Sequence, residues 1–283
     1  MHSTTHIERL PSALYAAKTD LPYSDVWNLH GLFDGLAFKS NLLLVGPKGI
    51  GKTMSFQSYA AKKSTPIVTF DCSEDVRRSN LLGMYVLRGD VTPFVLGPLT
   101  SAIEVANEVG SCILVLEEVN GLSPQMQKVL NPLADFRRRI EVPECGRVFD
   151  LRPGAKLWLV GTMNTSAYGG VYALNEDLKS RFRMLSLGYP APEEEQKIVL
   201  SHFNGEVDKV ALKKVMLLAQ ETRQKALEYA LSPRDVVQIL EDSVTVGMER
   251  ALRIILGKFE GDDQTTVKAR IQSIFGYTLT DKV

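Results

Sequence analysis

The 283-residue chain carries 33 lysines and arginines against 33 aspartates and glutamates, so its formal net charge is zero. This balance argues against a general nucleic-acid coat, which needs a basic surface, and leaves Arg137–Arg139 as the densest local basic run. That run fits either a solvated helix end or a local basic patch, so nucleic acid stays open as a partner that the charge does not indicate.

The cysteines and the lengths of the apolar runs indicate the cellular compartment of the protein. Cys72, Cys112 and Cys145 lie far apart without metal-ligand spacing, which indicates reduced, mostly buried thiols and implies no zinc site. The first 18 residues hold no signal-peptide core, and nowhere do about 18 apolar residues follow one another as a membrane span requires. We therefore expect a soluble, cytoplasmic protein with no membrane partner.

The first strong signals come from two neighbouring stretches. Apolar residues at helical spacing in Tyr23–Leu36 predict a short helix, which either packs in the core or also contacts a nucleotide base. The stretch Asn41–Thr53 then reads as a buried strand, Leu42–Val45, followed by a glycine-rich turn. Such a turn lets several backbone N–H groups point at one anion, with the lysine at its end on the outer phosphates and the following hydroxyl on Mg²⁺.

The elements after this turn alternate between helix and strand. A helix is expected over 54–63, a strand over 66–70, a hairpin over 87–96 that turns at Gly89–Asp90, and a helix over 99–109. A third buried strand, 112–116, places Glu117 and Glu118 at its carboxyl end. A helix over 123–139 and a hairpin over 140–150 follow.

Two further strands and a C-terminal region with only helical patterns complete the chain. The fourth strand, 156–160, leads to Asn164; a helix is expected over 174–180 and a fifth strand over 183–189. Beyond Pro192 only helical patterns occur, over 212–229, from the capped start Ser232–Asp235, and over about 248–256 and 267–275. The order predicts an α/β domain followed by a small helical domain.

The carboxylates suit hydrolysis of a nucleoside triphosphate. Glu117 would hold the Mg²⁺ shell, Glu118 would polarise the attacking water, and Asn164, one strand over, would orient that water. An arginine near the departing phosphoryl group lowers the barrier, and the candidates are Arg181, Arg183 and Arg234. Each of these arginines could instead be an ordinary surface or helix-start cation.

Together these residues resemble the AAA+ ATPases of the MoxR-like branch, which includes CbbQ, NorQ, GvpN and the cobaltochelatase small subunit. The likeness runs from about Leu42 to Phe182, with a weaker match at Ser232–Asp235. Its marks follow the family's order: Gly46–Thr53 as Walker A, Leu81–Gly83 followed by Phe94–Leu99, Ile113–Asn120 as Walker B, Gly161–Asn164 as sensor 1, Leu178–Phe182 as the arginine-finger helix end, and Ser232–Asp235 as sensor 2.

The resemblance implies a P-loop AAA+ core with a five-stranded parallel sheet over 1–190 and an all-helical lid over 191–283. Residues 85–96 would be the helix-2 insert and 140–150 the hairpin before sensor 1. ATP and Mg²⁺ are the implied ligands, with the nucleotide held by Gly46, Pro47, Lys48, Gly49, Ile50, Gly51, Lys52, Thr53 and Met54, and the metal by Thr53 and Glu117. It also implies a homo-oligomeric ring, commonly a hexamer, in which Arg181 reaches a neighbour's nucleotide and Arg234 senses the terminal phosphate.

One departure from the family pattern bears on turnover: Glu117 stands where the family usually has aspartate. Three hypotheses follow. The leading one is an ATP-driven motor that remodels a partner protein. The second is a nucleic-acid-associated ring that uses Arg137–Arg139, and the third is an ATP-gated assembly scaffold that Glu117 makes too slow to drive work.

Overall fold

The computed structural model describes residues 7–8, 15–165, 172–203, 207–224 and 227–279. Contacts divide the chain into two compact units. The first comprises Met1–Leu21, Asn28–Gly46 and Lys52–Leu187, and the second comprises Pro22–Trp27, Pro47–Gly51 and Gly188–Val283. This division falls near the expected domain boundary at residue 190 but assigns part of the glycine-rich turn to the second unit.

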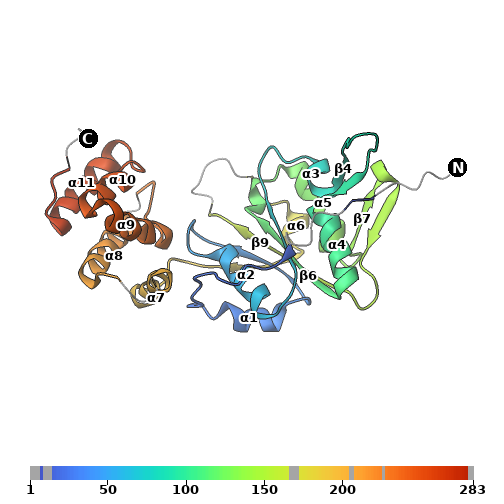
Figure 1. Cartoon of the computed structure of the whole chain (residues 1–283), viewed down its shortest axis with the longest axis horizontal. Helices are drawn as coiled ribbons and strands as arrows, with labels where there is room; N and C mark the ends of the chain where they lie inside the picture. Colours follow the sequence, from blue (N-terminus) through green and yellow to red (C-terminus); the bar gives the residue numbers. More distant parts are fainter. Residues whose placement is uncertain (1–6, 9–14, 166–171, 204–206, 225–226, 280–283) are drawn as a thin grey trace. The chain divides into compact units, whose positions relative to one another are not determined.

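A five-stranded, all-parallel sheet forms the centre of the first unit (Figure 1). In sheet order its strands are β10 (Phe182–Ser186), β2 (Asn41–Val45), β9 (Lys156–Met163), β6 (Ser111–Glu117) and β3 (Ile67–Asp71). The three central strands are nearly continuous apolar runs because both faces of a parallel sheet are covered. The fold class expected from the sequence is confirmed.

Helices follow the strands of the first unit and pack against them. They are α1 (Leu29–Leu36), α2 (Lys52–Lys62), α3 (Arg78–Leu82), α4 (Pro98–Val109), α5 (Pro124–Ala134) and α6 (Glu176–Lys179), with short 3₁₀ turns at Val119–Gly121 and Pro143–Cys145. α4 packs on β3, β6 and β9, and α2 packs on β6 and β9. Trp158 of β9 is 1% exposed and makes edge contacts with Phe33, Phe56 and Tyr59, which joins α1 and α2 to the sheet.

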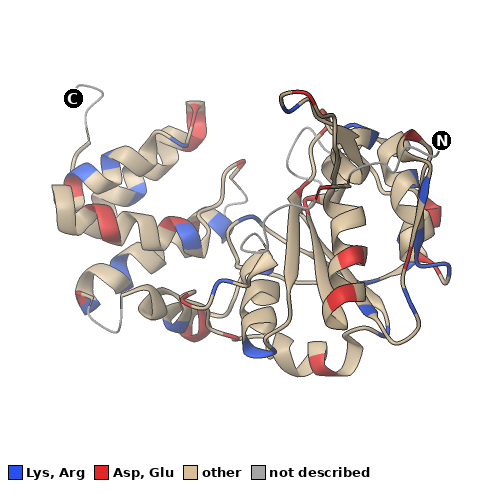
Figure 2. Cartoon of the chain, turned by 45° about the vertical axis from the view of Figure 1, so that its right-hand side comes forward, with Lys and Arg blue, Asp and Glu red and all other residues tan. Residues whose placement is uncertain are grey.

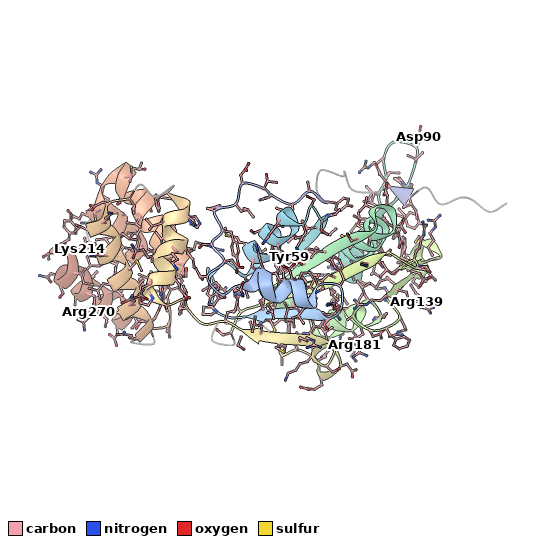
Figure 3. All side chains as sticks on the ribbon, turned by 90° about the horizontal axis from the view of Figure 1, so that it is seen from below. Tyr59, Asp90, Arg139, Arg181, Lys214 and Arg270 are labelled. Carbon is pink, nitrogen blue, oxygen red and sulfur yellow. The ribbon has the colours of Figure 1, made fainter. Side chains whose placement is uncertain are left out.

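Two hairpins extend from this core. β4 (Gly83–Tyr85) pairs antiparallel with β5 (Phe94–Leu96), and β1 (Ile7–Glu8) lies parallel to β5. The first hairpin turns at Gly89–Asp90, as predicted, and Asp90 lies at its tip (Figure 3). The second hairpin consists of β7 (Arg139–Val142) and β8 (Arg147–Asp150), which confirms the pairing expected over 140–150.

The second unit is helical, with α7 (Pro192–His202), α8 (Lys209–Gln224), α9 (Pro233–Val246), α10 (Met248–Leu256) and α11 (Gly261–Phe275). Ser232 caps α9 as predicted, because its hydroxyl accepts the backbone N–H of Asp235. The Asp235 carboxylate in turn accepts hydrogen bonds from Ser232, Tyr229 and Lys258. The helix expected over 212–229 ends at Gln224, and residues 225–226 lie outside the described part of the chain.

A buried ion pair also joins two helices of the second unit. Arg223 of α8 donates two hydrogen bonds of 2.7 Å to Glu195 of α7, whose side chain is 0% exposed. The guanidinium also lies 4.2 Å from the ring centroid of Tyr189. Because the pair is bidentate and removed from water, it fixes how the two helices pack.

The helix predicted over 123–139 is wrong at its carboxyl end. α5 stops at Ala134, Asp135 is extended, and Arg138 has a left-handed backbone with φ 47°. Arg137–Arg139 are therefore not a solvated helix end; Arg137 and Arg138 lie in a loop, and Arg139 is the first residue of β7. Directly after α5, Asp135 accepts the N–H of Arg137 at 2.9 Å, a turn that competes with continuation of the helix, and the Arg138 guanidinium then bonds to Asn41 at the start of β2.

Other boundaries differ by a few residues. α1 is shorter than the helix expected over 23–36, α6 is shorter than 174–180, and the fifth strand lies at 182–186 rather than 183–189. Figure 2 shows that Lys and Arg residues and Asp and Glu residues are distributed over both units. Of the helices within the described ranges, none combines the length and apolar character needed to cross a lipid bilayer.

Candidate functional site

The glycine-rich turn begins where β2 ends, at the carboxyl edge of the sheet. The N–H of Gly46 donates to the carbonyl of Met163, so the start of the turn is tied to the neighbouring strand β9. Gly49 and Gly51 have φ values of 73° and 93°, which L side chains rarely adopt. Within the second unit, a β-carbon at Gly49 would come within 2.3 Å of Ser232 Oγ and 3.2 Å of Arg234 Cβ. The glycine therefore meets both a conformational and a steric requirement.

Lys52, the first residue of α2, follows this turn in the sequence. Its ammonium group donates to the carbonyl of Gly46 at 2.8 Å and to Asn164 Oδ1 at 3.1 Å, and the residue is 8% exposed. A lysine can only donate, so Oδ1 of Asn164 faces Lys52 and the amide nitrogen faces the other way. That Nδ2 atom is buried without a hydrogen-bond partner among the described residues. Asn164 thus holds an unused donor beside the cation.

Thr53 and Glu117, the two residues expected to hold Mg²⁺, lie in contact. The Thr53 hydroxyl donates to Glu117 Oε2 at 2.8 Å, which joins α2 to the end of β6. A hydroxyl and a carboxylate are oxygen ligands suited to Mg²⁺, which is commonly bound by one or two carboxylates plus substrate phosphates. Within the described ranges no three His, Cys, Asp or Glu side chains gather as a protein-only metal cage. The donor set therefore fits Mg²⁺ that is shared with a phosphate ligand.

Glu118 follows in an unusual backbone conformation. Its φ of 51° and ψ of 51° are left-handed, and its N–H donates to Thr162 Oγ1 of β9 at 3.2 Å. The side chain is exposed, and no described residue forms a hydrogen bond or ion pair with its carboxylate. Register places it near Asn164, because β6 and β9 are neighbours with Leu116 opposite Gly161. A free carboxylate and a free amide donor therefore stand at the ends of adjacent strands.

The cysteine nearest this edge takes no part in such chemistry. Burial, with the nearby carboxylates of Asp71, Glu117 and Glu118, raises the pKa of the Cys72 thiol far above its ordinary value. The three cysteines are free and buried, as the sequence indicated. A thiol that stays protonated is a poor nucleophile, so the chemistry of the edge belongs to the carboxylates.

Arg181 lies elsewhere, at the amino edge of the sheet. It directly precedes β10, whose Phe182 is in register with Asn41, the first residue of β2. The turn lies at the other end of β2, four residues on, or about 13 Å away along the strand. The structure thus brings Lys52, Thr53, Glu117 and Asn164 together with Glu118 nearby, and it separates Arg181 from them.

The amino edge has its own network, which sequence reasoning missed. Asn41, 4% exposed, donates to the carbonyls of Ala134 and Arg181 at 2.7 and 2.9 Å. Its Oδ1 accepts from Arg138 at 3.0 Å, and Arg138 also donates to the carbonyl of Leu133 at 3.2 Å. Asn41 is thus the hub that fixes the backbone of Arg181. The available signal was a polar residue heading a buried apolar strand.

Arg183 and Arg234 complete the predicted cations. Arg183 is exposed on β10, and Arg234 is the second residue of α9 in the second unit. The side chain of Arg181 donates to the carbonyl of Asp177, and its buried Nε has no hydrogen-bond partner among the described residues. Figure 3 shows Arg181 at the border of the first unit.

The chain is similar in sequence to several known proteins. The family described as AAA domain (dynein-related subfamily) matches residues 41–182. The chain is 31% identical to protein CbbQ of Hydrogenophilus thermoluteolus over 182 residues, which cover 64% of this chain and 65% of CbbQ. It is 32% identical to protein NorQ of Paracoccus denitrificans over 158 residues, 56% of each chain. The match thus spans less than two thirds of CbbQ and NorQ.

A longer match involves a protein without a described role. An uncharacterized protein of Staphylococcus haemolyticus is 27% identical over 247 residues, which cover 83% of this chain and 90% of the relative. A solved structure from Cytophaga hutchinsonii covers 84% of this chain and 77% of its own at 17% identity, with a TM-score of 0.49. A likeness that distant has no bearing on activity.

Proposed function

The chain belongs to the AAA domain family, dynein-related subfamily; from that premise we propose that it is an ATP hydrolase of the MoxR-like AAA+ branch, copies of which assemble into a ring in which hydrolysis remodels a partner protein. The observation that carries the proposal is the network around Lys52. Lys52 bonds to Gly46, where the glycine-rich turn begins, and to Asn164, and the next residue, Thr53, bonds to Glu117 at the same edge of the sheet. CbbQ and NorQ are the relatives that motivate the MoxR-like assignment.

Each residue of the carboxyl edge has a role in hydrolysis. The turn, Gly46 to Gly51, would cradle the phosphates through its N–H groups, and Lys52 would neutralise the outer ones. Thr53 and Glu117 would hold Mg²⁺, which supplies positive charge to the phosphate oxygens. Glu118 would take a proton from the attacking water, and Asn164 Nδ2 would hold that water or the terminal phosphate. Met54, the third residue of α2, would lie beside the bound nucleotide.

The position of Arg181 supports a ring. Because it lies about one strand length from its own phosphate turn, it would serve a nucleotide bound by the adjoining copy. Arg181 lines a hollow of about 330 Å³ at the amino edge together with Lys39, Arg138 and Arg183. Phe136, also at this hollow, is 93% exposed. A cationic face with a bare aromatic ring suits contact with a second copy that presents phosphates. Arg234 would sense the terminal phosphate from the second unit.

Mixing two inactive variants tests the arrangement. Glu118→Gln removes the base in its own site, whereas Arg181→Ala removes the cation lent to a neighbour. Each variant alone should turn over ATP at least about a hundredfold more slowly than the parent. Mixed in equal amounts, they should recover about a quarter of parental turnover, because one site in four pairs an intact base with an intact arginine. No recovery from rings that demonstrably exchange subunits would refute the shared site.

Two alternative functions predict experimental results that differ from those of the motor. If the ring serves nucleic acid, DNA should bind in a salt-sensitive way and stimulate turnover. If the protein is a slow scaffold, ATP should promote assembly while Glu118→Gln changes little. The motor predicts Mg²⁺-dependent turnover that nuclease treatment leaves intact, and capture of a partner protein by Glu118→Gln in ATP.

A further inference from the structure

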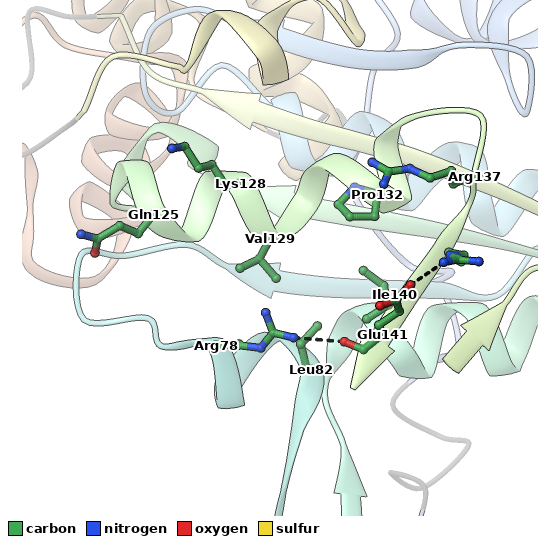
Figure 4. A pocket seen from close by; sticks show the side chains of 10 residues that line it. Arg78, Leu82, Gln125, Lys128, Val129, Pro132, Arg137, Ile140 and Glu141 are labelled. Carbon is green, nitrogen blue, oxygen red and sulfur yellow. Dashed lines mark hydrogen bonds and ion pairs between the residues drawn. The ribbon is translucent and has the colours of Figure 1, made fainter. Parts of the chain in front are cut away.

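A pocket of about 390 Å³ lies between α3, α5 and β7, away from the nucleotide site (Figure 4). Val129, Pro132 and Ile140 give it an apolar floor, with Leu82 beside them. In Figure 4, Val129 and Ile140 lie near its centre, and Gln125 and Arg137 lie at its two ends. The volume is at the small end of the roughly 300 to 1,000 Å³ of ligand pockets, which suits one large side chain better than a whole helix.

Four cations line this apolar floor, and they differ in how they are paired. Arg78 and Arg139 are engaged by the hairpin acids Glu144 and Glu141, and Arg78 also donates to the carbonyl of Glu141. Arg137 binds Asp135, and this hydrogen bonding lowers the pKa of the Asp135 carboxyl, which keeps it charged.

Lys128 is the exception among these cations. Among the described residues no hydrogen bond or ion pair reaches its ammonium group, and the residue is exposed on α5. The pocket therefore offers one unpaired cation and several arginines that retain free N–H groups.

The pocket also lies at the base of both hairpins. Leu82 ends α3 and directly precedes β4, while Ile140 and Glu141 belong to β7. A segment bound there would touch the roots of the two hairpins. This inference rests on the proposed function, in which these two hairpins are the elements that act on a partner protein.

We propose that this pocket binds a segment of a partner protein in which a large apolar side chain stands beside an aspartate or glutamate. The apolar side chain packs on Val129 and Ile140. The carboxylate binds Lys128 and the N–H groups of Arg78. Charge-assisted hydrogen bonds at the rim orient the segment, and burial of the apolar side chain supplies most of the affinity.

The charge pattern favours this occupant over nucleic acid. A phosphate backbone gains affinity from many unpaired cations, because each one releases counterions. Here three of the four cations are already paired with a carboxylate, and those carboxylates would repel a polyanion. A single carboxylate next to an apolar group needs only one unpaired cation and an apolar floor.

A library of random twelve-residue peptides displayed on phage, selected on the full-length protein in Mg²⁺ and ATP, tests the proposal. Lys128→Glu is the first counter-selection variant, because its side chain touches no described partner. Arg78→Gln combined with Lys128→Gln is the second. The matched control is Lys62→Gln combined with Lys156→Gln, which neutralises two exposed lysines that do not line the pocket. Selected peptides are then synthesised with a fluorescein label and titrated.

The enriched peptides should pair Asp or Glu with Leu, Ile, Met, Phe or Trp. Their dissociation constants should rise at least tenfold in both pocket variants and stay within twofold in the control. Equal binding by the pocket variants, or enrichment of basic or purely polar peptides, would overturn the proposal. So would tighter binding of a labelled twenty-nucleotide oligothymidine that the same variants abolish. Because binding is read without turnover, a protein that binds these peptides but never hydrolyses ATP would refute the motor and leave the pocket standing.

Discussion

Replacing Asn41 by leucine tests whether the amino edge of the sheet positions Arg181. Leucine has the same number and branching of side-chain heavy atoms with bulkier methyl groups, so the change keeps the shape of the side chain and removes its polar contacts. It abolishes the donors to the carbonyls of Ala134 and Arg181 and the acceptor for Arg138. Because Asn41 is 4% exposed, water cannot fully replace these bonds. Two carbonyls and one guanidinium N–H would lose their partner.

The expected destabilisation follows from these groups. A buried polar group left without its partner costs about 1 to 3 kcal/mol, and the guanidinium retains its bond to the carbonyl of Leu133. Partial access of water to the Arg138 side reduces the sum, so we expect about 2 to 4 kcal/mol locally. That corresponds to an opening equilibrium raised by about 30- to 1,000-fold at this edge.

Hydrogen exchange read by mass spectrometry is the suitable assay, because a chain with two units need not unfold in one step. Amides of β2 and β10 should lose protection by the stated factor, while those of α8 to α11 should not change. Turnover should fall as it does in Arg181→Ala, because the backbone of Arg181 has lost its anchor. Asn107→Leu is the matched control: Asn107 makes two hydrogen bonds to backbone groups at 2.9 and 2.8 Å, but in an exposed position. It should cost less than about 1 kcal/mol.

A double-mutant cycle with Arg138→Met isolates the central contact. A hydrogen bond to a charged group contributes about 1.5 to 3 kcal/mol, so the two changes should fall short of additive by about that amount. Unchanged protection of β2 and β10 in Asn41→Leu would refute the reasoning. Normal turnover despite lost protection would show that the network supports the fold but does not position Arg181.

Three further outcomes are expected. Glu195→Gln or Arg223→Met should destabilise the second unit by about 3 to 5 kcal/mol, read by exchange in α7 and α8, because either change leaves a buried charge unpaired. Burial raises the pKa of Asp235, but its hydrogen bonds outweigh this and hold it below 3.8. Asp235→Asn should therefore destabilise α9 at pH 7, and the difference from the parent should vanish as the pH falls through the folded pKa. Glu117→Gln should raise the Mg²⁺ concentration for half-maximal turnover about 10- to 100-fold, because the site loses the negative charge of a proposed metal ligand and the carboxylate that accepts from Thr53.

The local signals in the sequence predicted the elements that local physics determines. Apolar runs bounded by glycine gave the parallel strands, and Ser232-Pro-Arg-Asp235 gave the helix start with its capping bonds. The same reasoning failed at 135–139, where the helical pattern continues but the chain does not. The turn after α5, in which Asp135 accepts the N–H of Arg137, is local and competes with the helix. Arg138, beyond the end of α5, bonds to Asn41, which is 97 residues earlier in the chain. No local pattern contains a partner at that distance, so the Asn41 hub needed the fold.

The backbone conformation of Glu118 distinguishes the motor hypothesis from the scaffold hypothesis. A left-handed conformation costs a non-glycine residue about 1 to 2 kcal/mol, and Glu118 adopts it at φ 51° at the end of the central strand β6. Glycine would remove this strain, but it would also remove the carboxylate. In this strained conformation the exposed, unpaired carboxylate of Glu118 lies at the strand end next to Asn164. The N–H of Glu118 donates to the hydroxyl of Thr162. A scaffold that only binds ATP has no use for such a group, whereas a hydrolase needs an ionised base with no competing partner. The strain at Glu118 therefore favours turnover even with glutamate at position 117.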